Sequence, residues 1–281
     1  SVYGPTRTFC NTVLARHGIE TTYYPPSADI REYLHPNTRL VVTEAPGSLT
    51  FEMQDIDAIV EATHQHGALV AMDNTWATPL FYCPIEHGVD VSIQAGTKYI
   101  AGHSDLVIGL ITSATESLHQ TIFDSTRSFG DVAGPDDSYL AMRGLRTMAV
   151  RLREQQDSAL KVAEWLQARP EVAQVLYPPL PSDPGHALWK RDFSGAASLF
   201  GMALHTHDLA AAERMVNDLE LFQIGSSWGG YESLVAVNRT PFGREHVPWS
   251  STPFLLRFHI GLEDVDDLIT DLEAGFERLA R

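Results

Sequence analysis

Residues 94–105 read QAGTKYIAGHSD, and this stretch indicates the fold class because of what precedes it. It follows directly on the short apolar run VSI (91–93). A second apolar run, ALVAM (68–72), ends in the same way at an acidic residue, Asp73. Short continuous apolar runs of this kind predict buried strands. The chain therefore carries a lysine, Lys98, and an acid that each lie just beyond the end of a predicted strand.

A helical pattern lies between two of the predicted strands, which indicates an α/β architecture. DIDAIVEATHQHG (55–67) has apolar residues at helical spacing and ends at a glycine. Strands are predicted on either side of it, at 39–46, 68–73, 91–94 and 107–112. Strand–helix–strand order with continuous apolar strands predicts a mostly parallel sheet covered on both faces. Ligands bind such sheets beyond the carboxyl ends of the strands, where Lys98 and Asp73 are expected.

The second half of the chain predicts a smaller domain. A long helical tract over residues 138–170 stops at a proline and crosses from the first domain into the second. Beyond the proline-rich loop PPLPSDPG (178–185), strands and helices mix. Strands are predicted at 195–204 and 253–261 and helices at 208–219 and 262–280, with one more helix near the chain start at 9–18. The prediction is a large α/β domain over residues 1–145 and a smaller α+β domain over 146–281.

The composition narrows the class of protein and its surroundings. The 281 residues carry a net charge of −16, which argues against non-specific nucleic-acid binding and against an anionic membrane surface. No apolar stretch is long enough to span a bilayer, and the start, SVYGPTRTF, lacks the basic and then apolar pattern of a signal peptide. Cys10 and Cys83 make no disulfide framework, so a cytoplasmic location is expected. No Cys/His spacing indicates a metal site.

An amine and a carboxylate at one sheet edge suit one kind of chemistry. The amine of Lys98 would hold an aldehyde cofactor as a Schiff base, and Asp73 would keep the pyridine nitrogen of that cofactor protonated. Pyridoxal 5'-phosphate (PLP) uses both groups because its ring stores the electrons of a carbanion. A lysine and an aspartate in isolation are also consistent with a surface lysine and an aspartate that caps a helix. The surrounding sequence therefore has to distinguish this alternative from a cofactor site.

The surrounding sequence resembles the Cys/Met-metabolism family of PLP enzymes, and within it the branch of bacterial cystathionine β-lyases. The likeness covers residues 1–281 and consists of long motifs in a fixed order. These motifs are VYGPTRTF (2–9), EAPGSLTFE (44–52), DNTWATP (73–79), TKYIAGHSD (97–105), RGLRTMAVRL (143–152), SSWGGYESL (226–234) and LRFHIGLEDVDDLI (256–269). The resemblance implies PLP-dependent transferase fold type I, which is the fold of aspartate aminotransferase.

The resemblance also implies which residues hold the cofactor. Lys98 corresponds to the family's Schiff-base lysine and catalytic base, and Asp73 to the partner of the pyridine nitrogen. Thr97 is expected to contact the phosphate, because a hydroxyl donates to phosphate oxygens. Tyr3 matches the tyrosine that stacks on the ring and helps take a proton from the substrate amine. Many relatives carry a serine three residues before the lysine, where this chain has Ala95.

Substrate-binding residues are implied in the same way. Arg257 matches the arginine that clamps the substrate α-carboxylate with its planar fork. Ser227 and Trp228 match the loop beside that carboxylate. Trp228 is typical of the β-lyase branch, since the γ-lyase and γ-synthase branches usually carry leucine there. In STRSF (125–129), where β-lyases often have a tyrosine, Arg127 either meets a distal carboxylate or is solvated.

The implied function is β-elimination of L-cystathionine to homocysteine, pyruvate and ammonia by a homotetramer in transsulfuration and methionine biosynthesis. Two alternatives remain. One is another reaction of the family, by a γ-lyase, a sulfhydrylase or a cysteine desulfhydrase, and the other is a truncated homologue without catalysis. Relatives carry a segment before the position of Ser1 that contributes to the phosphate site and to a neighbouring subunit. The large domain is thus expected to be N-terminally incomplete. Either the chain is a fragment, or its recorded sequence omits the N-terminal part, or the protein has lost that part.

Overall fold

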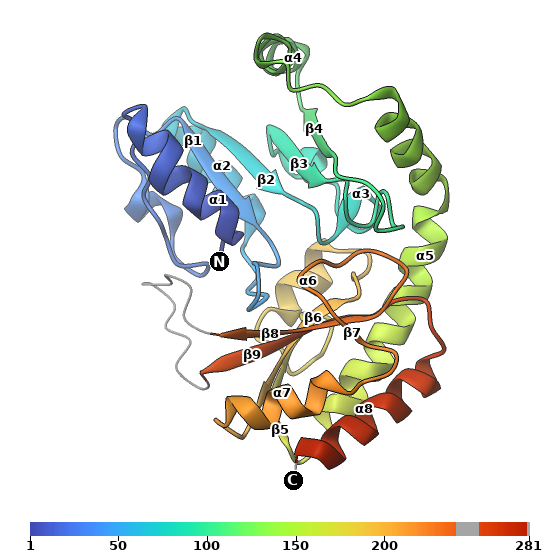
Figure 1. Ribbon diagram of the computed structural model, residues 1–281. Coiled ribbons are helices and arrows are strands. Elements are labelled where there is room, and N and C mark those ends of the chain that lie inside the picture. The colour runs from blue at the N-terminus through green and yellow to red at the C-terminus, as the bar shows by residue number, and fades with distance from the viewer. Residues whose placement is uncertain (240–252, 280–281) are drawn as a thin grey trace.

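Two β-sheets organise the protein, as shown in Figure 1. The computed structural model describes residues 1–239 and 253–279. The first sheet has the order β1 (Leu40–Glu44), β2 (Leu69–Asp73), β3 (Val91–Ala95) and β4 (Gly109–Ser113). The first three strands are parallel and β4 is antiparallel to β3. The prediction of a mostly parallel sheet is therefore confirmed.

The helices of the first half begin and end where local residue types favour it. In α2 (Ile56–His66), the Asp55 side chain accepts from the Ala58 N–H, and Gly67 follows in a left-handed conformation, as predicted. The predicted helix 9–18 starts earlier, as α1 (Gly4–Phe9), with a proline in its first turn. The remaining helical segments are η1 (Cys10–Leu14), η2 (Ile30–Tyr33), α3 (Thr78–Phe81), η3 (Pro84–His87) and α4 (Glu116–Phe129).

Strand β1, at the edge of the first sheet, differs from expectation in its covering. Val41 of β1 packs in a small cluster with Ile59 of α2, but Leu40 and Val42 are 51% and 39% exposed. Strand side chains alternate between the two faces, so the residues around Val41 point the other way. Within the described residues, α2 thus covers one face of β1, and the predicted cover on both faces is not found there.

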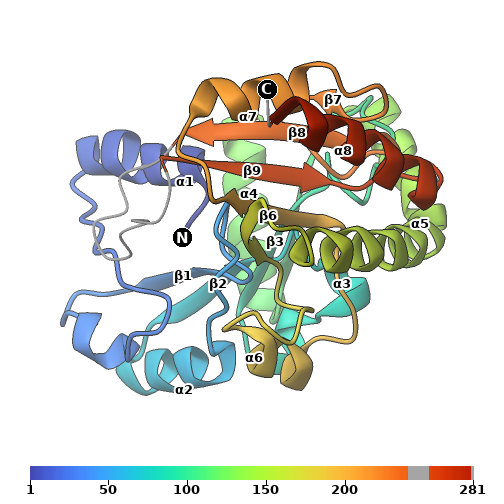
Figure 2. The same cartoon turned by 90° about the horizontal axis from the view of Figure 1, so that it is seen from below.

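The second half is built on an antiparallel sheet with one parallel edge. Its strand order is β5-β6-β9-β8-β7, in which β7 pairs with β8 in parallel. Helices α7 and α8 contact each other and lie along one side of this sheet (Figure 2). Its elements are β5 (Val172–Leu176), α6 (His186–Asp192), β6 (Leu199–Leu204), α7 (Leu209–Asn217), β7 (Gln223–Ile224), β8 (Leu234–Arg239), β9 (Phe254–His259) and α8 (Val265–Leu279). The predicted strands and helices of this half are confirmed, while β5, β7, β8 and α6 carried no prediction.

Helix α5 (Pro135–Gln167) joins the two halves. Its 33 residues run alongside both sheets in Figure 1, and the proposed domain division between residues 145 and 146 falls inside it. One continuous hydrophobic core includes Met72 of β2, Leu152 of α5 and Phe200 of β6. The halves therefore share a core, and the position of the division stays a proposal.

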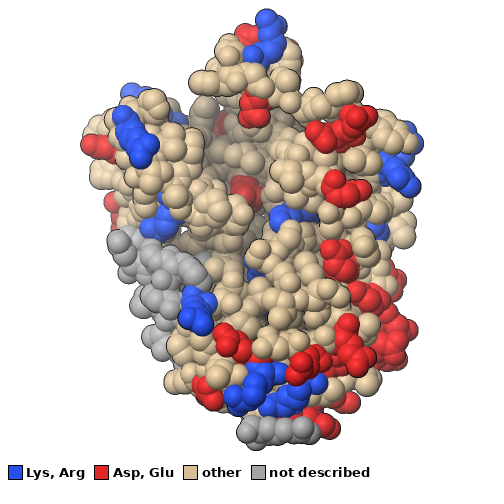
Figure 3. Space-filling view, viewed as in Figure 1, with Lys and Arg blue, Asp and Glu red and all other residues tan. Residues whose placement is uncertain are grey.

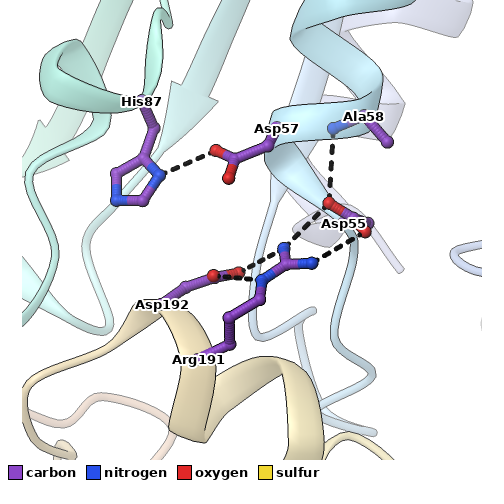
Figure 4. A network of polar contacts seen from close by, with 6 residues as sticks. All are labelled: Asp55, Asp57, Ala58, His87, Arg191 and Asp192. Atoms are coloured by element: carbon purple, nitrogen blue, oxygen red, sulfur yellow. Dashed lines mark hydrogen bonds and ion pairs between the residues drawn. The ribbon is translucent and has the colours of Figure 1, made fainter.

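An ion-pair network also links the halves. Figure 4 shows Arg191 of α6 in contact with Asp55, the residue that caps α2, through two hydrogen bonds of 2.9 and 3.1 Å. Arg191 also pairs with its neighbour Asp192, and His87 pairs with Asp57 nearby. The guanidinium of Arg191 lowers the pKa of Asp55. Because Arg191 and Asp55 are half-exposed, the pair contributes at most about 1 kcal/mol to stability.

Acidic side chains gather on the lower right of the face shown in Figure 3, in the region of α5 and α8. The first turn of α8 supplies Asp266 and Asp267, where negative charge is favourable at a helix N-terminus. Within the described residues, no helix has the length and apolar character needed to cross a membrane.

Candidate active site

Lys98 and Asp73 lie at the same edge of the first sheet. Asp73 is the last residue of β2, and Lys98 follows the end of β3 by three residues. Strands β2 and β3 are parallel neighbours, with Asp73 opposite Ile93. The carboxyl ends of both strands therefore face the same way, and the structure brings the two residues to one edge, as the sequence predicted.

The amine of Lys98 meets the loop between β7 and β8. Its Nζ donates to the Ser227 hydroxyl at 2.7 Å and lies 5.2 Å from the centre of the Trp228 ring. Among the described residues, no carboxylate pairs with it. Burial, and then the charge of Arg257, lower the pKa of Lys98. A larger fraction of the amine is thus neutral at a given pH, which suits a nucleophile or a base.

Asp73 belongs to a pair of carboxyl groups. Its Oδ1 accepts from the backbone N–H of Thr75 at 3.0 Å and from the Thr75 hydroxyl, while burial raises its pKa. Glu44, the last residue of β1, stands opposite Asp73 in the sheet and accepts from the Tyr3 N–H at 2.7 Å. Burial, and then the charge of Asp73, raise the pKa of Glu44 to about 8. Sequence reasoning missed Glu44, although it lies in the predicted strand 39–46 and is the first residue of a family motif.

The hydroxyl of Thr97 forms hydrogen bonds within the connection from β3 to β4. The hydroxyl accepts from the Ile108 N–H at 3.0 Å and donates to the Ile108 carbonyl at 3.3 Å. A contact of Thr97 with a phosphate stays a prediction. At the Ala95 position, the backbone N–H donates to the Thr75 hydroxyl at 2.9 Å.

Arg257 of β9 holds the same loop that touches Lys98. Its Nη2 donates to the Ser226 carbonyl at 2.6 Å and lies 3.4 Å from the Ser227 carbonyl. Burial lowers the pKa of Arg257. Within the described chain, no carboxylate forms an ion pair with it. The structure thus brings together Lys98, Ser227, Trp228 and Arg257.

Tyr3 and Arg127 lie in very different places. Tyr3 is 49% exposed at the start of α1. Its phenol lies near Arg257 and raises the pKa of Arg257, against the lowering by burial.

Arg127 is exposed in the last turn of α4, which contributes no buried residue. Helix α4 stands at the far end of the molecule from β8 and β9 in Figure 1. This position favours the solvated alternative for Arg127.

A buried arginine anchors the turn that follows Lys98. Arg151 of α5 donates through Nη2 to the carbonyls of Tyr99 (2.8 Å) and Gly144 (2.9 Å). Burial lowers the pKa of Arg151. Gly102 has φ of +69°, and a Cβ there would overlap the guanidinium of Arg151. Arg151 lies in the family motif RGLRTMAVRL (143–152), but the sequence alone assigned it no role.

Other reactive side chains form no site in the part of the chain that the structure describes. No group of three or more His, Cys, Asp or Glu residues there could hold a metal ion. Both cysteines, Cys10 and Cys83, are free thiols. His64 pairs with Asp90 at 2.8 Å, and His66 lies 2.8 Å from the carbonyl of His35.

Known proteins resemble the chain over nearly its whole length. The sequence pattern of the family described as Cys/Met metabolism PLP-dependent enzyme matches residues 1–277. Cystathionine beta-lyase MetC of Escherichia coli is 42% identical over 294 residues, which cover 99% of this chain and 72% of the relative. Cystathionine beta-lyase of Bordetella avium is 43% identical over 279 residues, covering 99% and 70%. A crystal structure of cystathionine gamma synthase from Xanthomonas oryzae pv. oryzae in complex with cystathionine matches with a TM-score of 0.91 and 33% identity, covering 99% of this chain and 74% of that one.

The contact between Arg151 and Gly102 can be tested with a double-mutant cycle. Arg151→Ala should lower the free energy of unfolding by about 3 kcal/mol, because buried carbonyls lose their donor and a cavity remains. Gly102→Ala should cost about 2 kcal/mol, through the overlap and the left-handed backbone. The double variant should lose clearly less than the two single losses combined, since the alanine Cβ then enters vacated space. Urea unfolding measures all three, and additive losses would contradict the contact.

Proposed function

Because the chain belongs to the Cys/Met metabolism family of PLP-dependent enzymes, we propose that it is a carbon–sulfur lyase acting on L-cystathionine. β-Elimination of this substrate consumes one water and yields homocysteine, pyruvate and ammonia. The β-lyases above are 42% and 43% identical to the chain and the γ-synthase 33%, which supports the β reaction. The observation that carries the proposal is the contact of Lys98 with the loop that Arg257 holds.

The residues at the sheet edge fit the family's cofactor. Lys98 offers an amine without a carboxylate partner among the described residues, and the Oδ2 of Asp73 likewise has no hydrogen-bond donor there. We assign Lys98 to the aldehyde of PLP, Asp73 to its ring nitrogen, Tyr3 to its ring face and Thr97 to its phosphate. When bound, PLP supplies a ring that accepts the electron pair released at the substrate Cα.

Arg257 is assigned to the α-carboxylate of the substrate. Its Nη2 is engaged with the loop, but its Nε and Nη1 have no acceptor within the described chain. A planar guanidinium binds a carboxylate through two parallel hydrogen bonds. Such a clamp, with Ser227 and Trp228 beside it, fixes the direction of the substrate Cα–H bond toward Lys98.

The lowered pKa of Lys98 favours the neutral amine, the form that accepts a proton. In the proposed reaction, Nζ of Lys98 takes the proton from the substrate Cα and later delivers a proton to the departing sulfur. The hydroxyl of Ser227, at 2.7 Å from Nζ, orients the amine between these steps. The phenol oxygen of Tyr3 is assigned to accept a hydrogen bond from the incoming substrate amine.

Product analysis tests the reaction. The purified protein, given PLP and L-cystathionine, should form pyruvate and homocysteine in equal amounts, measured by mass spectrometry. Lys98→Ala should lower the rate at least about 1,000-fold, because it removes the group that moves the proton. Formation of 2-oxobutyrate would contradict β-elimination and indicate the γ-lyase alternative. A chain that neither reacts nor gains visible absorbance with PLP would contradict the enzyme assignment itself.

Arg257→Lys tests the carboxylate clamp. A lysine keeps the charge but not the planar fork, so we expect kcat/KM for cystathionine to fall about 10- to 100-fold, mostly through KM. Arg127→Lys, on exposed α4, is the matched control and should leave both constants unchanged. An unaltered KM in Arg257→Lys would remove Arg257 from the substrate site.

We extend the proposal to the assembly and location of the protein, a homotetramer in the cytoplasm. Large apolar side chains exposed along α4 and α5 support an interface; they are Phe129, Tyr139, Met142, Leu145 and Val150. The free thiols of both cysteines fit a reducing compartment. Light scattering of the purified protein should give a molar mass of four chains of 31.1 kDa. A monomer at micromolar concentration would contradict the assembly.

A further inference from the structure

His259 is a buried histidine to which the proposed reaction assigns no role. It lies on β9 two residues after Arg257, so both side chains point to the same face of the sheet. Its exposed fraction is 1%. Burial is the main cause that lowers the pKa of His259 to about 3, and the charges of Arg257 and Lys98 act in the same direction. The imidazole is therefore neutral across the physiological pH range.

The hydrogen bonds around His259 select one tautomer. Nε2 lies 3.1 Å from the Gly229 N–H and 3.2 Å from the Gly230 carbonyl, and Nδ1 lies 3.1 Å from the Ser198 hydroxyl. A proton on Nε2 would leave the buried N–H of Gly229 without an acceptor there. The Gly230 carbonyl already accepts from Gln155 Nε2 at 2.7 Å. The proton thus belongs on Nδ1, facing Ser198, and Nε2 accepts from Gly229.

Gly229 in turn touches the backbone of Lys98. Its φ is +88°, and a Cβ at this position would lie 2.8 Å from the Cα, C and Cβ atoms of Lys98. The loop backbone is thus packed against Lys98 with no room for a side chain. Ser227 and Trp228, just before Gly229, meet the amine of the same lysine. A shift of Gly229 would move these contacts away from Nζ.

The other side of His259 reaches the residue after Lys98. The hydroxyl of Ser198 accepts from Nδ1 of His259 and lies 3.2 Å from the phenol oxygen of Tyr99. The same phenol oxygen accepts a hydrogen bond from the backbone N–H of Ser198. Tyr99 is fully buried. His259 therefore connects the loop on one side of Lys98 with the anchored tyrosine on the other.

We propose that His259 is a positioning residue of the active site: its Nε2 holds the Gly229 N–H and thereby sets residues 226–230 against Lys98. The inference rests on the proposed function only in taking Lys98 as the reacting amine. Arg257, on the same strand, holds the start of the loop through the Ser226 carbonyl. His259 holds its end, so the two residues act on one loop.

Two amide replacements separate the roles of the two ring nitrogens. Glutamine places an oxygen near the position of Nε2, whereas the shorter asparagine reaches only the position of Nδ1. Hydrogen exchange of the whole protein, followed by mass spectrometry, should show the Gly229 amide exchanging at least about 10-fold faster in His259→Asn than in His259→Gln. His186→Asn, at a half-buried histidine bonded to the Pro178 carbonyl, is the matched control and should leave this amide unchanged.

Reactivity of Lys98 gives a second readout that does not need turnover. PLP added to cofactor-free protein is fixed on Lys98 by borohydride, and the modified peptide is measured against pH. When the loop leaves Lys98, burial decreases and the pKa of the amine moves back up, so the midpoint of the capture curve should rise in His259→Asn and stay in place in His259→Gln. With cystathionine, kcat should fall about 10- to 100-fold in His259→Asn, while His259→Gln should retain at least about a third of the wild-type kcat.

Equal exchange at Gly229 and equal capture midpoints in the two variants would overturn the positioning role. If His259→Asn does not fold, Ser198→Ala replaces it. Without the Ser198 hydroxyl, Nδ1 loses its partner and the ring is held less firmly, so the Gly229 amide should again exchange faster, and unchanged exchange would overturn the proposal. A wild-type protein without lyase activity that still shows the exchange and capture differences would refute the proposed function and leave the role of His259 standing.

Discussion

The close contact between the backbones of Gly229 and Lys98 is the constraint on which the proposed site depends. The lysine follows strand β3 of the first sheet and the glycine lies in the loop between β7 and β8 of the second, so the site exists only where the halves meet. Their packing excludes even a Cβ, and densely packed atoms transmit small displacements. The shared core and helix α5 hold the two sheets at this distance.

Basic groups gather at this junction without carboxylate partners among the described residues. Burial lowers the pKa of Lys98, Arg257 and His259, and the charge of Arg257 adds to the effect on the other two. Buried cations are costly when they lack counter-ions. An anionic ligand would relieve this cost, and both the phosphate of PLP and the carboxylates of an amino acid carry negative charge.

The segment after Lys98 is held from behind by α5. The guanidinium of Arg151 donates to the carbonyls of Tyr99 and Gly144, and a Cβ at Gly144 would overlap the carbonyl of Ala101. The helix thus approaches the turn as closely as a backbone allows. Together with the loop in front, this contact confines Lys98 between two fixed surfaces, which a reacting amine needs.

The sequence by itself determined the types of most elements and the edge at which Lys98 and Asp73 lie, because periodicity, helix caps and strand ends are local properties. It did not determine that α2 covers one face of β1, nor the hydrogen bonds that occupy Thr97. Only the tertiary structure placed Glu44 opposite Asp73 and His259 against the N–H of Gly229. Lys98 and Ser227 are 129 residues apart in the chain, and such contacts depend on how whole elements pack, which no local pattern encodes.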